Sequence, residues 1–221
     1  MPVLGVGVLA GSGAAIIGVA DTGKTDEVET LDAALLLSLR TPGDLADPIG
    51  AHWVEEAARD FTGLGGVSVL TFVVLSAALL LAMAGRRFSA MAVAVAGGGA
   101  ALLGVVLKGW FDRPRPDLVP HAVRVFNESF PSGHATGAAA VYLTLGMLLA
   151  RAVPDPAAKL WLVAVSITVT LLVAASRVYL GVHWPTDVLA GLAVGATWAS
   201  LCWLVELSLQ KRGKVEPTED R

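Results

Sequence analysis

The chain alternates long apolar runs with shorter polar segments. The apolar runs cover residues 3–20, 64–84, 88–107, 134–152, 158–177 and 187–208. Each is close to the roughly 20 residues that an α-helix needs to cross the hydrocarbon core of a bilayer. Helices are the spanning element that such continuous runs allow, because a helix satisfies its own backbone hydrogen bonds. The pattern therefore predicts an all-α bundle of six transmembrane helices.

Residues 21–63, between the first two runs, form an acidic segment. They hold ten carboxylates and three cations, with a shorter apolar patch at Leu31–Leu39. Such a segment predicts one or two helices that lie at the membrane surface, where they could restrict which lipids enter. Residues 1–23 contain no Lys or Arg, so we expect the first run to be a retained span and not a cleaved signal peptide.

Composition supports the membrane class. The chain is 55% hydrophobic and 16% charged, whereas an ordinary soluble domain is about 45–50% apolar and about 25% charged. The formal net charge of −3 argues against a nucleic-acid-binding protein, and the single Cys202 cannot form an intrachain disulfide. We expect one integral-membrane domain over residues 1–221 and no metal-type cluster of Cys and His.

The distribution of Lys and Arg predicts the orientation of the spans, because these residues mark cytoplasmic loops. Cations follow the second span, flank the turn between the fourth and fifth, and follow the sixth, so both termini are expected in the cytoplasm. The opposite face nevertheless carries cations of its own. A cationic cluster where cations are normally scarce predicts an anion-binding site on the extracytoplasmic face. Its members are Lys108, Arg113, Arg115 and Arg124.

Three clusters of polar residues stand at the ends of apolar runs on that face. In the first and third, Lys108, Arg115 and Arg177 offer the donors that phosphate oxygens accept. In the second, Ser132 and Gly133 stand where a helix should begin, and the amides of a helix N-terminus favour an anion.

Two histidines near these cations could divide the chemistry of phosphoryl transfer. His183 and Asp187 are four residues apart, so the carboxylate could orient the imidazole and leave its other nitrogen as a nucleophile. His134, at the start of a different predicted helix, is a candidate acid for the leaving group.

Together these clusters resemble the signature of the type 2 phosphatidic acid phosphatase superfamily, which includes bacterial undecaprenyl pyrophosphate and phosphatidylglycerophosphate phosphatases. The matching positions are Lys108-x6-Arg115-Pro116, Pro131-Ser132-Gly133-His134 and Ser176-Arg177-x5-His183-x3-Asp187.

The resemblance implies a lipid phosphate substrate, hydrolysis on the extracytoplasmic side of a lipid bilayer, and no metal or cofactor. It implies that His183 forms a phosphohistidine, that Asp187 orients it, and that His134 acts as acid and then base. The phosphoryl oxygens would be held by Lys108, Arg115, Ser132, Gly133 and Arg177.

Other readings stay open at this point. A phosphotransferase with an alcohol acceptor needs the same first step, and an anion transporter is a third possibility. Lys108 and Arg177 could be lipid-surface anchors, and Ser132 a plain helix cap. Arg113 and Arg124 could serve substrate contact or loop structure. The exact lipid and the oligomeric state do not follow from the sequence.

Overall fold

The computed structural model describes residues 26–125 and 128–211 of the chain. The predicted first span, residues 3–20, lies outside this range. The described elements are α2 (Asp26–Leu37), β1 (Arg40–Thr41), β2 (Asp44–Pro48), α3 (His52–Leu64), α4 (Val67–Met83), α5 (Arg87–Phe111), α6 (Gly133–Ala152), α7 (Pro156–Tyr179) and α8 (Pro185–Lys211).

Four described helices, α5 to α8, are long and apolar enough to cross a membrane. A fifth candidate is the pair α3 and α4, which is bent by 49° at its break. The sequence predicted a span over 64–84 there, which contains α4, and the structure adds α3 before it across a break at Gly65. A side-chain carbon added at Gly65 would lie 2.4 Å from Cγ1 of Val173. The described residues thus hold four or five candidate spans, and the predicted count of six is not reached among them.

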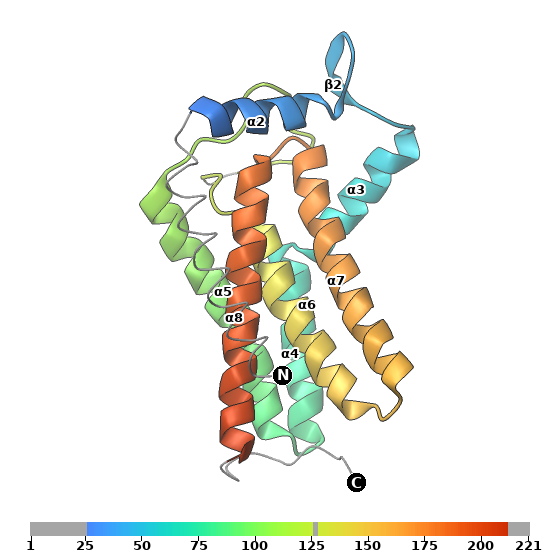
Figure 1. Ribbon diagram of the computed structural model, residues 1–221, viewed down its shortest axis with the longest axis vertical. Coiled ribbons are helices and arrows are strands. Elements are labelled where there is room, and N and C mark those ends of the chain that lie inside the picture. The colour runs from blue at the N-terminus through green and yellow to red at the C-terminus, as the bar shows by residue number, and fades with distance from the viewer. Residues whose placement is uncertain (1–25, 126–127, 212–221) are drawn as a thin grey trace.

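The spans pack closely around α6, which contacts α7 and α8 extensively (Figure 1). Gly191 and Gly195 on α8 make this approach possible. An added Cβ would lie 2.6 Å from the Ser132 carbonyl at Gly191 and 2.3 Å from the Thr136 carbonyl at Gly195. Glycine at these two positions thus lets α6 and α8 pack closely. It also means that α8 supports the first turn of α6.

The described part of the acidic segment, residues 26–63, includes one end of the molecule. Helix α2 lies across this end, and the hairpin of β1 and β2 stands beside it (Figure 1). Helices α2 and α3 lie in this segment, but their placement at the membrane surface stays a prediction, and α3 belongs to the bent candidate span. The hairpin was not predicted. Pro42-Gly43 at its turn is the local signal for it, because proline and glycine favour the second and third positions of a tight turn.

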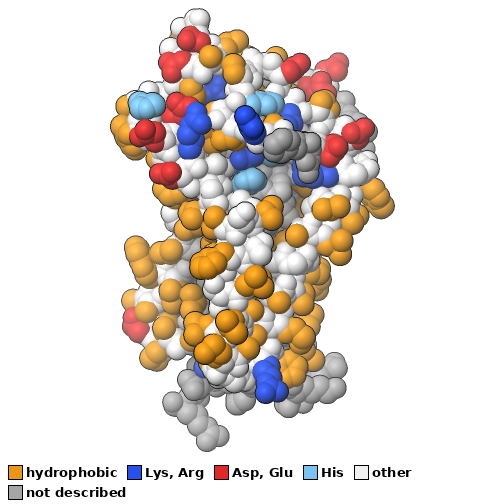
Figure 2. Space-filling view, turned by 180° about the vertical axis from the view of Figure 1, so that it is seen from behind, with side chains coloured by type: hydrophobic (Ala, Val, Ile, Leu, Met, Phe, Trp, Pro, Cys, Tyr) orange, Lys and Arg blue, Asp and Glu red, His pale blue; other side chains and the backbone are white. Residues whose placement is uncertain are grey.

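Charged and apolar side chains separate along the molecule. Figure 2 shows Lys, Arg, Asp, Glu and His side chains gathered at the end covered by α2, with mostly hydrophobic side chains over the rest of that face. Large apolar side chains are exposed on the outer sides of the spans, for example Leu79, Leu102 and Leu171. So many exposed apolar side chains are expected on a surface that contacts lipid and not water. The protein is a multi-pass membrane protein.

Candidate active site

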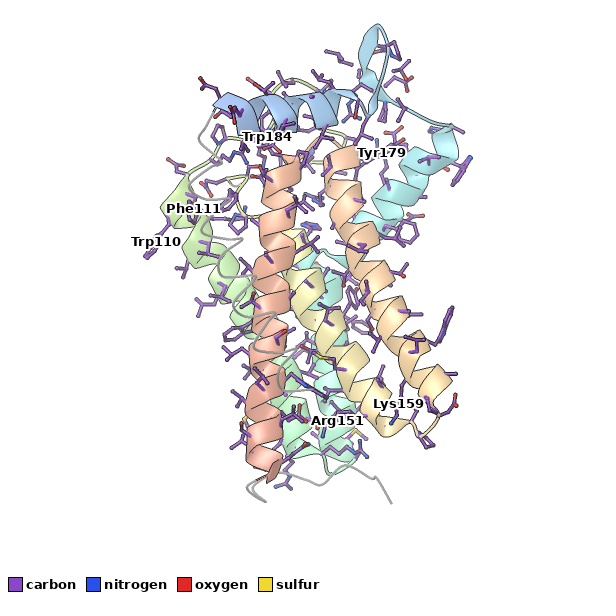
Figure 3. The ribbon with its side chains drawn as sticks, in the orientation of Figure 1. Trp110, Phe111, Arg151, Lys159, Tyr179 and Trp184 are labelled. Atoms are coloured by element: carbon purple, nitrogen blue, oxygen red, sulfur yellow. The ribbon has the colours of Figure 1, made fainter. Side chains whose placement is uncertain are left out.

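All eight predicted site residues lie at the α2 end of the bundle. Lys108 comes from the last turn of α5, His134 from the start of α6, and Arg177 from the end of α7. His183 stands in the turn that leads into α8. His134 interacts electrostatically with Lys108, Arg115, Arg177 and His183, so the three sequence clusters converge in space. In Figure 3 the labels of Trp184 and Tyr179 mark this end of the bundle, and the labels of Arg151 and Lys159 mark the opposite end.

A glycine turn places His183. Gly181 has φ +74°, a left-handed backbone that glycine adopts without a steric cost. A side chain there would also meet Val119 at 2.7 Å and the guanidinium of Arg40 at 2.8 Å. Arg40 in turn donates to the Tyr179 carbonyl at 3.0 Å, at the end of α7. The turn is therefore held from outside as well as by its own backbone.

His183 is buried and is held on both ring nitrogens. Its Nδ1 lies 3.2 Å from Oγ of Ser129 and 3.5 Å from Oδ2 of Asp187. Ser129 also donates a short hydrogen bond to the same carboxylate oxygen. The predicted contact between the His183 imidazole and the Asp187 carboxylate is thus present. Ser129, beside it, was not predicted from the sequence.

The other ring nitrogen of His183 faces a cation. Nη1 of Arg115 lies 3.1 Å from Nε2 of His183. A guanidinium can only donate, so Nε2 is the acceptor and the proton of the neutral ring belongs on Nδ1. This is the tautomer that a nucleophilic histidine needs, because the lone pair points away from the carboxylate.

Burial keeps His183 neutral. Loss of hydration lowers its pKa from the ordinary 6.5 to about 4, against the opposing effect of the hydrogen bond to Asp187. Burial also lowers the pKa of Arg115 from its ordinary value. The guanidinium of Arg115 stays charged at neutral pH because arginine titrates so far above it.

Lys108 and Arg115 meet at one main-chain oxygen. Lys108 donates a short hydrogen bond through Nζ to the Glu128 carbonyl, and Nη2 of Arg115 lies 3.3 Å from the same oxygen. Asp112, with φ 41°, is the C-cap of α5, and its amide donates to the Lys108 carbonyl at 3.3 Å. Two cations that share one oxygen acceptor can also share a phosphoryl oxygen.

The start of α6 offers donors beside these cations. Gly133 is exposed, and a Cβ added there would come no closer than 4.0 Å to Lys108 Cε. Ser132 caps the helix by position, yet its side chain makes no capping bond, and within residues 26–125 and 128–211 its buried Oγ has no hydrogen-bond partner. The reading of Ser132 as a plain helix cap is therefore wrong. A buried hydroxyl without a partner is costly unless something else uses it.

Arg177 is buried at the same place. Its Nη1 donates to Oγ1 of Thr62 on α3 at 2.8 Å, and its buried Nε has no hydrogen-bond partner in the part of the chain that the structure describes. Only 3% of its surface is exposed, which does not fit a side chain that anchors at the lipid surface. Thr62 is a second residue that the sequence reading missed.

The sequence allowed two roles for Arg113, substrate contact or loop structure. In the structure its side chain holds other residues of the site in place. It donates to Asp187 Oδ1 at 2.8 Å and to Asp32 Oδ2 at 2.8 Å. Its guanidinium carbon also lies 5.6 Å from the ring centroid of Trp184. Asp32 of α2 was not predicted as part of the site. Arg124, the other open case, is exposed.

Within residues 26–125 and 128–211, no group of three or more His, Cys, Asp and Glu side chains could hold a metal ion. The site is instead rich in cations: Lys108, Arg113, Arg115 and Arg177. Such a set is suited to an oxyanion held by side chains and by the amides at the start of α6.

A family model described as the PAP2 superfamily matches residues 87–210, more than half of the chain. The chain belongs to the PAP2 superfamily.

Among its relatives in this superfamily, phosphatidylglycerophosphatase B of Bacillus subtilis is 34% identical over 144 residues, which cover 65% of this chain and 70% of that protein. Decaprenylphosphoryl-5-phosphoribose phosphatase of Mycobacterium tuberculosis is 38% identical over 109 residues, 47% of this chain and 55% of that protein. These PAP2 relatives are named as phosphatases, which confirms the predicted enzyme class, a hydrolase of phosphoric ester bonds.

Solved PAP2 structures agree with the fold. The crystal structure of the transmembrane PAP2-type phosphatidylglycerolphosphate phosphatase from Bacillus subtilis superposes with a TM-score of 0.83 at 28% identity, over 91% of this chain and 96% of that chain. The crystal structure of Aquifex aeolicus LpxE superposes with a TM-score of 0.59 at 22% identity, over 79% and 95%, and shows a shared fold.

Proposed function

We propose that this PAP2 protein hydrolyses a phosphomonoester or pyrophosphate of a lipid through a phosphohistidine on His183. One observation carries the proposal. The buried imidazole of His183 has its Nδ1 turned to Asp187 and Ser129 and its Nε2 turned to the guanidinium of Arg115. A lone pair that faces a cation, with a carboxylate behind the ring, suits attack on a phosphorus atom whose oxygens that cation binds.

In the first half-reaction, the lone pair of His183 Nε2 attacks phosphorus and a P–N bond forms. The bond from phosphorus to the leaving oxygen breaks, and its electron pair stays on that oxygen. A protonated His134 then supplies the proton that turns the oxygen into an alcohol or a phosphate. Positive charge grows on the His183 ring, and Asp187 stabilises it from the Nδ1 side.

In the second half-reaction, His134 takes a proton from water, and the resulting hydroxide attacks phosphorus. The P–N bond breaks, and its electron pair returns to His183. Charge on the phosphoryl oxygens would be met by Lys108, Arg115 and Arg177, by the Ser132 hydroxyl and by the amide of Gly133. Such fixed donors usually contribute most to this type of catalysis.

The position of the site suggests a lipid substrate. The cationic cluster lies at the end of the spans, where the apolar outer surface gives way to charge, so a lipid headgroup could reach it with the chains still in the bilayer. The PAP2 relatives are named for phosphatidylglycerophosphate and for a decaprenyl-linked phosphate. The distribution of Lys and Arg suggests that this end faces away from the cytoplasm and that both termini lie in the cytoplasm.

The test is phosphate release in detergent with EDTA present. The substrates are undecaprenyl pyrophosphate, phosphatidylglycerophosphate and phosphatidic acid, and the proteins are the native chain and His183→Ala. We expect release that survives chelation and falls by at least about 10⁴-fold in the variant, as expected for loss of a nucleophile. A radiolabelled phosphoryl group should stay on the native protein and be stable to base and labile to acid.

Two results would count against the proposal. Equal release by both proteins would remove His183 from the reaction. No release from any of the three lipids, followed by transfer of label to an added alcohol, would identify a phosphotransferase instead.

A further inference from the structure

Asp32 of α2 is buried inside the site although α2 belongs to the acidic segment outside the bundle. Only 1% of its surface is exposed. Its Oδ1 accepts from the Thr186 amide at 3.0 Å, and its Oδ2 accepts from the Thr186 hydroxyl and from Nη2 of Arg113 at 2.8 Å. A buried carboxylate is costly unless it is paired, and here every contact leads to residues next to Asp187.

Arg113 joins the carboxylates of Asp32 and Asp187 through the two terminal nitrogens of its guanidinium group. Nη2 serves Asp32, while Nη1 donates to Asp187 Oδ1 at 2.8 Å and to the Thr186 hydroxyl at 2.7 Å. The other oxygen of Asp187, Oδ2, faces His183 and also accepts from the Trp184 amide at 3.0 Å. The order in space is Asp32, Arg113, Asp187 and then His183.

The net charge of Asp32, Arg113 and Asp187 determines the electrostatic environment of the His183 ring. Two carboxylates and one guanidinium carry one net negative charge, and it lies on the side of His183 Nδ1. Without the Asp32 charge, Arg113 and Asp187 would cancel each other. The imidazole would then lose the negative neighbour that stabilises its growing positive charge.

We propose that Asp32 is a positioning residue that acts through Arg113: it offsets the charge of the guanidinium, so that the group behind His183 Nδ1 keeps one net negative charge. The inference rests on the proposed phosphohistidine mechanism. It makes α2, far upstream of the signature residues, part of the machinery for forming the P–N bond. Asp32 touches neither the predicted phosphate ligands nor His183, so its effect belongs to the rate of attack and not to substrate binding.

The experiment compares Asp32→Asn, Arg113→Gln and the double variant with the native chain. Asn keeps the shape of Asp32 and an acceptor for the Thr186 amide, and it loses the charge together with the bond that Oδ2 accepts from Arg113. Glu29→Gln removes an exposed carboxylate one turn away on the same helix and is the matched control. Each protein is assayed for kcat and KM on phosphatidic acid and for the single-turnover rate of phosphoenzyme formation, after gel filtration and a thermal melt.

We expect Asp32→Asn to lower kcat and the phosphorylation rate by at least about tenfold at nearly native KM, the effect of one nearby charge at an effective dielectric constant near 20. The double variant restores one net negative charge, so it should be at least about threefold faster than Asp32→Asn alone on the same scale. Glu29→Gln should behave as the native chain.

A purely structural role for Asp32 predicts the opposite ranking. Arg113→Gln removes further contacts, so the double variant would then be no faster than Asp32→Asn, and that result would overturn the proposal. Native kcat in a folded Asp32→Asn protein would overturn it as well. If His183→Ala is as active as the native chain, the proposed mechanism itself has failed, which is a different outcome from an inert Asp32→Asn variant in a protein that needs His183.

Discussion

Charged clusters lie at both ends of the bundle, and they use their charges differently. At the end away from α2, Arg151 of α6 pairs with the buried Glu206 of α8 at 3.4 Å and also donates to Gln210. Its guanidinium carbon lies 4.7 Å from the ring centroid of Trp203, and Ser89 of α5 donates to Glu206 at 3.4 Å. This cluster joins three helices through mutually paired groups.

At the α2 end, several donors meet neutral groups. Lys108 donates to the carbonyl of Glu128, Arg177 donates to a threonine hydroxyl, and the Ser132 hydroxyl has no hydrogen-bond partner among the described residues. A cation on a neutral acceptor keeps most of its field for another anion. We infer that the far cluster stabilises the fold, whereas the α2 end retains positive charge that a ligand could use.

The largest difference is expected from equal changes to one arginine in each cluster. Arg115→Met should lower kcat/KM by about 10²- to 10³-fold, the usual loss when a donor to a developing oxyanion is removed. Arg151→Met should leave kcat/KM near the native value but lower the melting temperature, because the buried Glu206 loses its ion pair with Arg151. Phosphate release and thermal melts in the same detergent check both.

This prediction has two ways to fail. A folded Arg115→Met protein with near-native kcat/KM would remove Arg115 from the phosphate site. Loss of activity in Arg151→Met without loss of stability would mean that the far cluster influences the reaction, and the contrast between the two ends would be wrong.

A smaller difference is expected between two buried hydroxyls on α6. Both the Ser132 hydroxyl, at the N-cap of α6, and the Thr144 hydroxyl, within the span, lack a hydrogen-bond partner among the described residues, but only Ser132 lies near the cations. Ser132→Ala should lower kcat/KM by about 10- to 100-fold, the loss of a hydrogen bond to a charged group. Thr144→Val, which keeps the shape, should not lower it. Equal effects of the two variants would show that the Ser132 hydroxyl has no role in binding phosphate.

How far the sequence predicted this site depends on the distance over which each contact acts. Ser132-Gly133-His134 and the pair His183 and Asp187 are local patterns, and the structure brings them together as expected. Asp32 and Thr62 were missed because their partners, Arg113 and Arg177, lie far along the chain. The spacing of residues within a short stretch of sequence does not reveal such long-range contacts.

One signal could have drawn attention to Asp32. It is a carboxylate inside the apolar patch Leu31–Leu39, where a charge is expensive unless it has a partner.

The fold, too, could be predicted only where local sequence decides the structure. Long apolar runs predicted helices α5 to α8 well, since their length alone decides them, whereas the bend between α3 and α4 depends on packing against α6 and α7.

Helix packing under the site gives a third contrast. Gly191→Ala would place a carbon 2.6 Å from the Ser132 carbonyl, so the start of α6 must shift; overpacking of this kind costs about 1–3 kcal/mol. We expect a lower melting temperature together with a several-fold loss of kcat, because Ser132 and Gly133 move. Gly98→Ala on α5 meets nothing within 4 Å and is the control. A native kcat in Gly191→Ala would show that the first turn of α6 tolerates displacement.

The smallest effect concerns the proton on His183. Its pKa in the folded protein, about 4, lies below the ordinary 6.5, so the unfolded chain binds this proton at higher pH than the folded chain. The contribution of His183 to stability is therefore complete above pH 6.5 and is lost as the pH falls toward 4. Nitrogen NMR of histidine-labelled protein should show a neutral ring protonated on Nδ1 from pH 7 to pH 5. In the denatured chain the same ring should titrate near 6.5.

Added inorganic phosphate should raise the pKa of His183, because a bound anion beside Nε2 favours the charged ring. The same addition should leave the melting behaviour of His183→Ala less affected than that of the native chain. A His183 signal that titrates near 6.5 in the folded protein would mean that water reaches the ring. In that case the low-dielectric surroundings that distinguish the α2 end from an ordinary surface cluster would be absent, and the field of Arg115 and Arg177 would be screened before it reached a substrate.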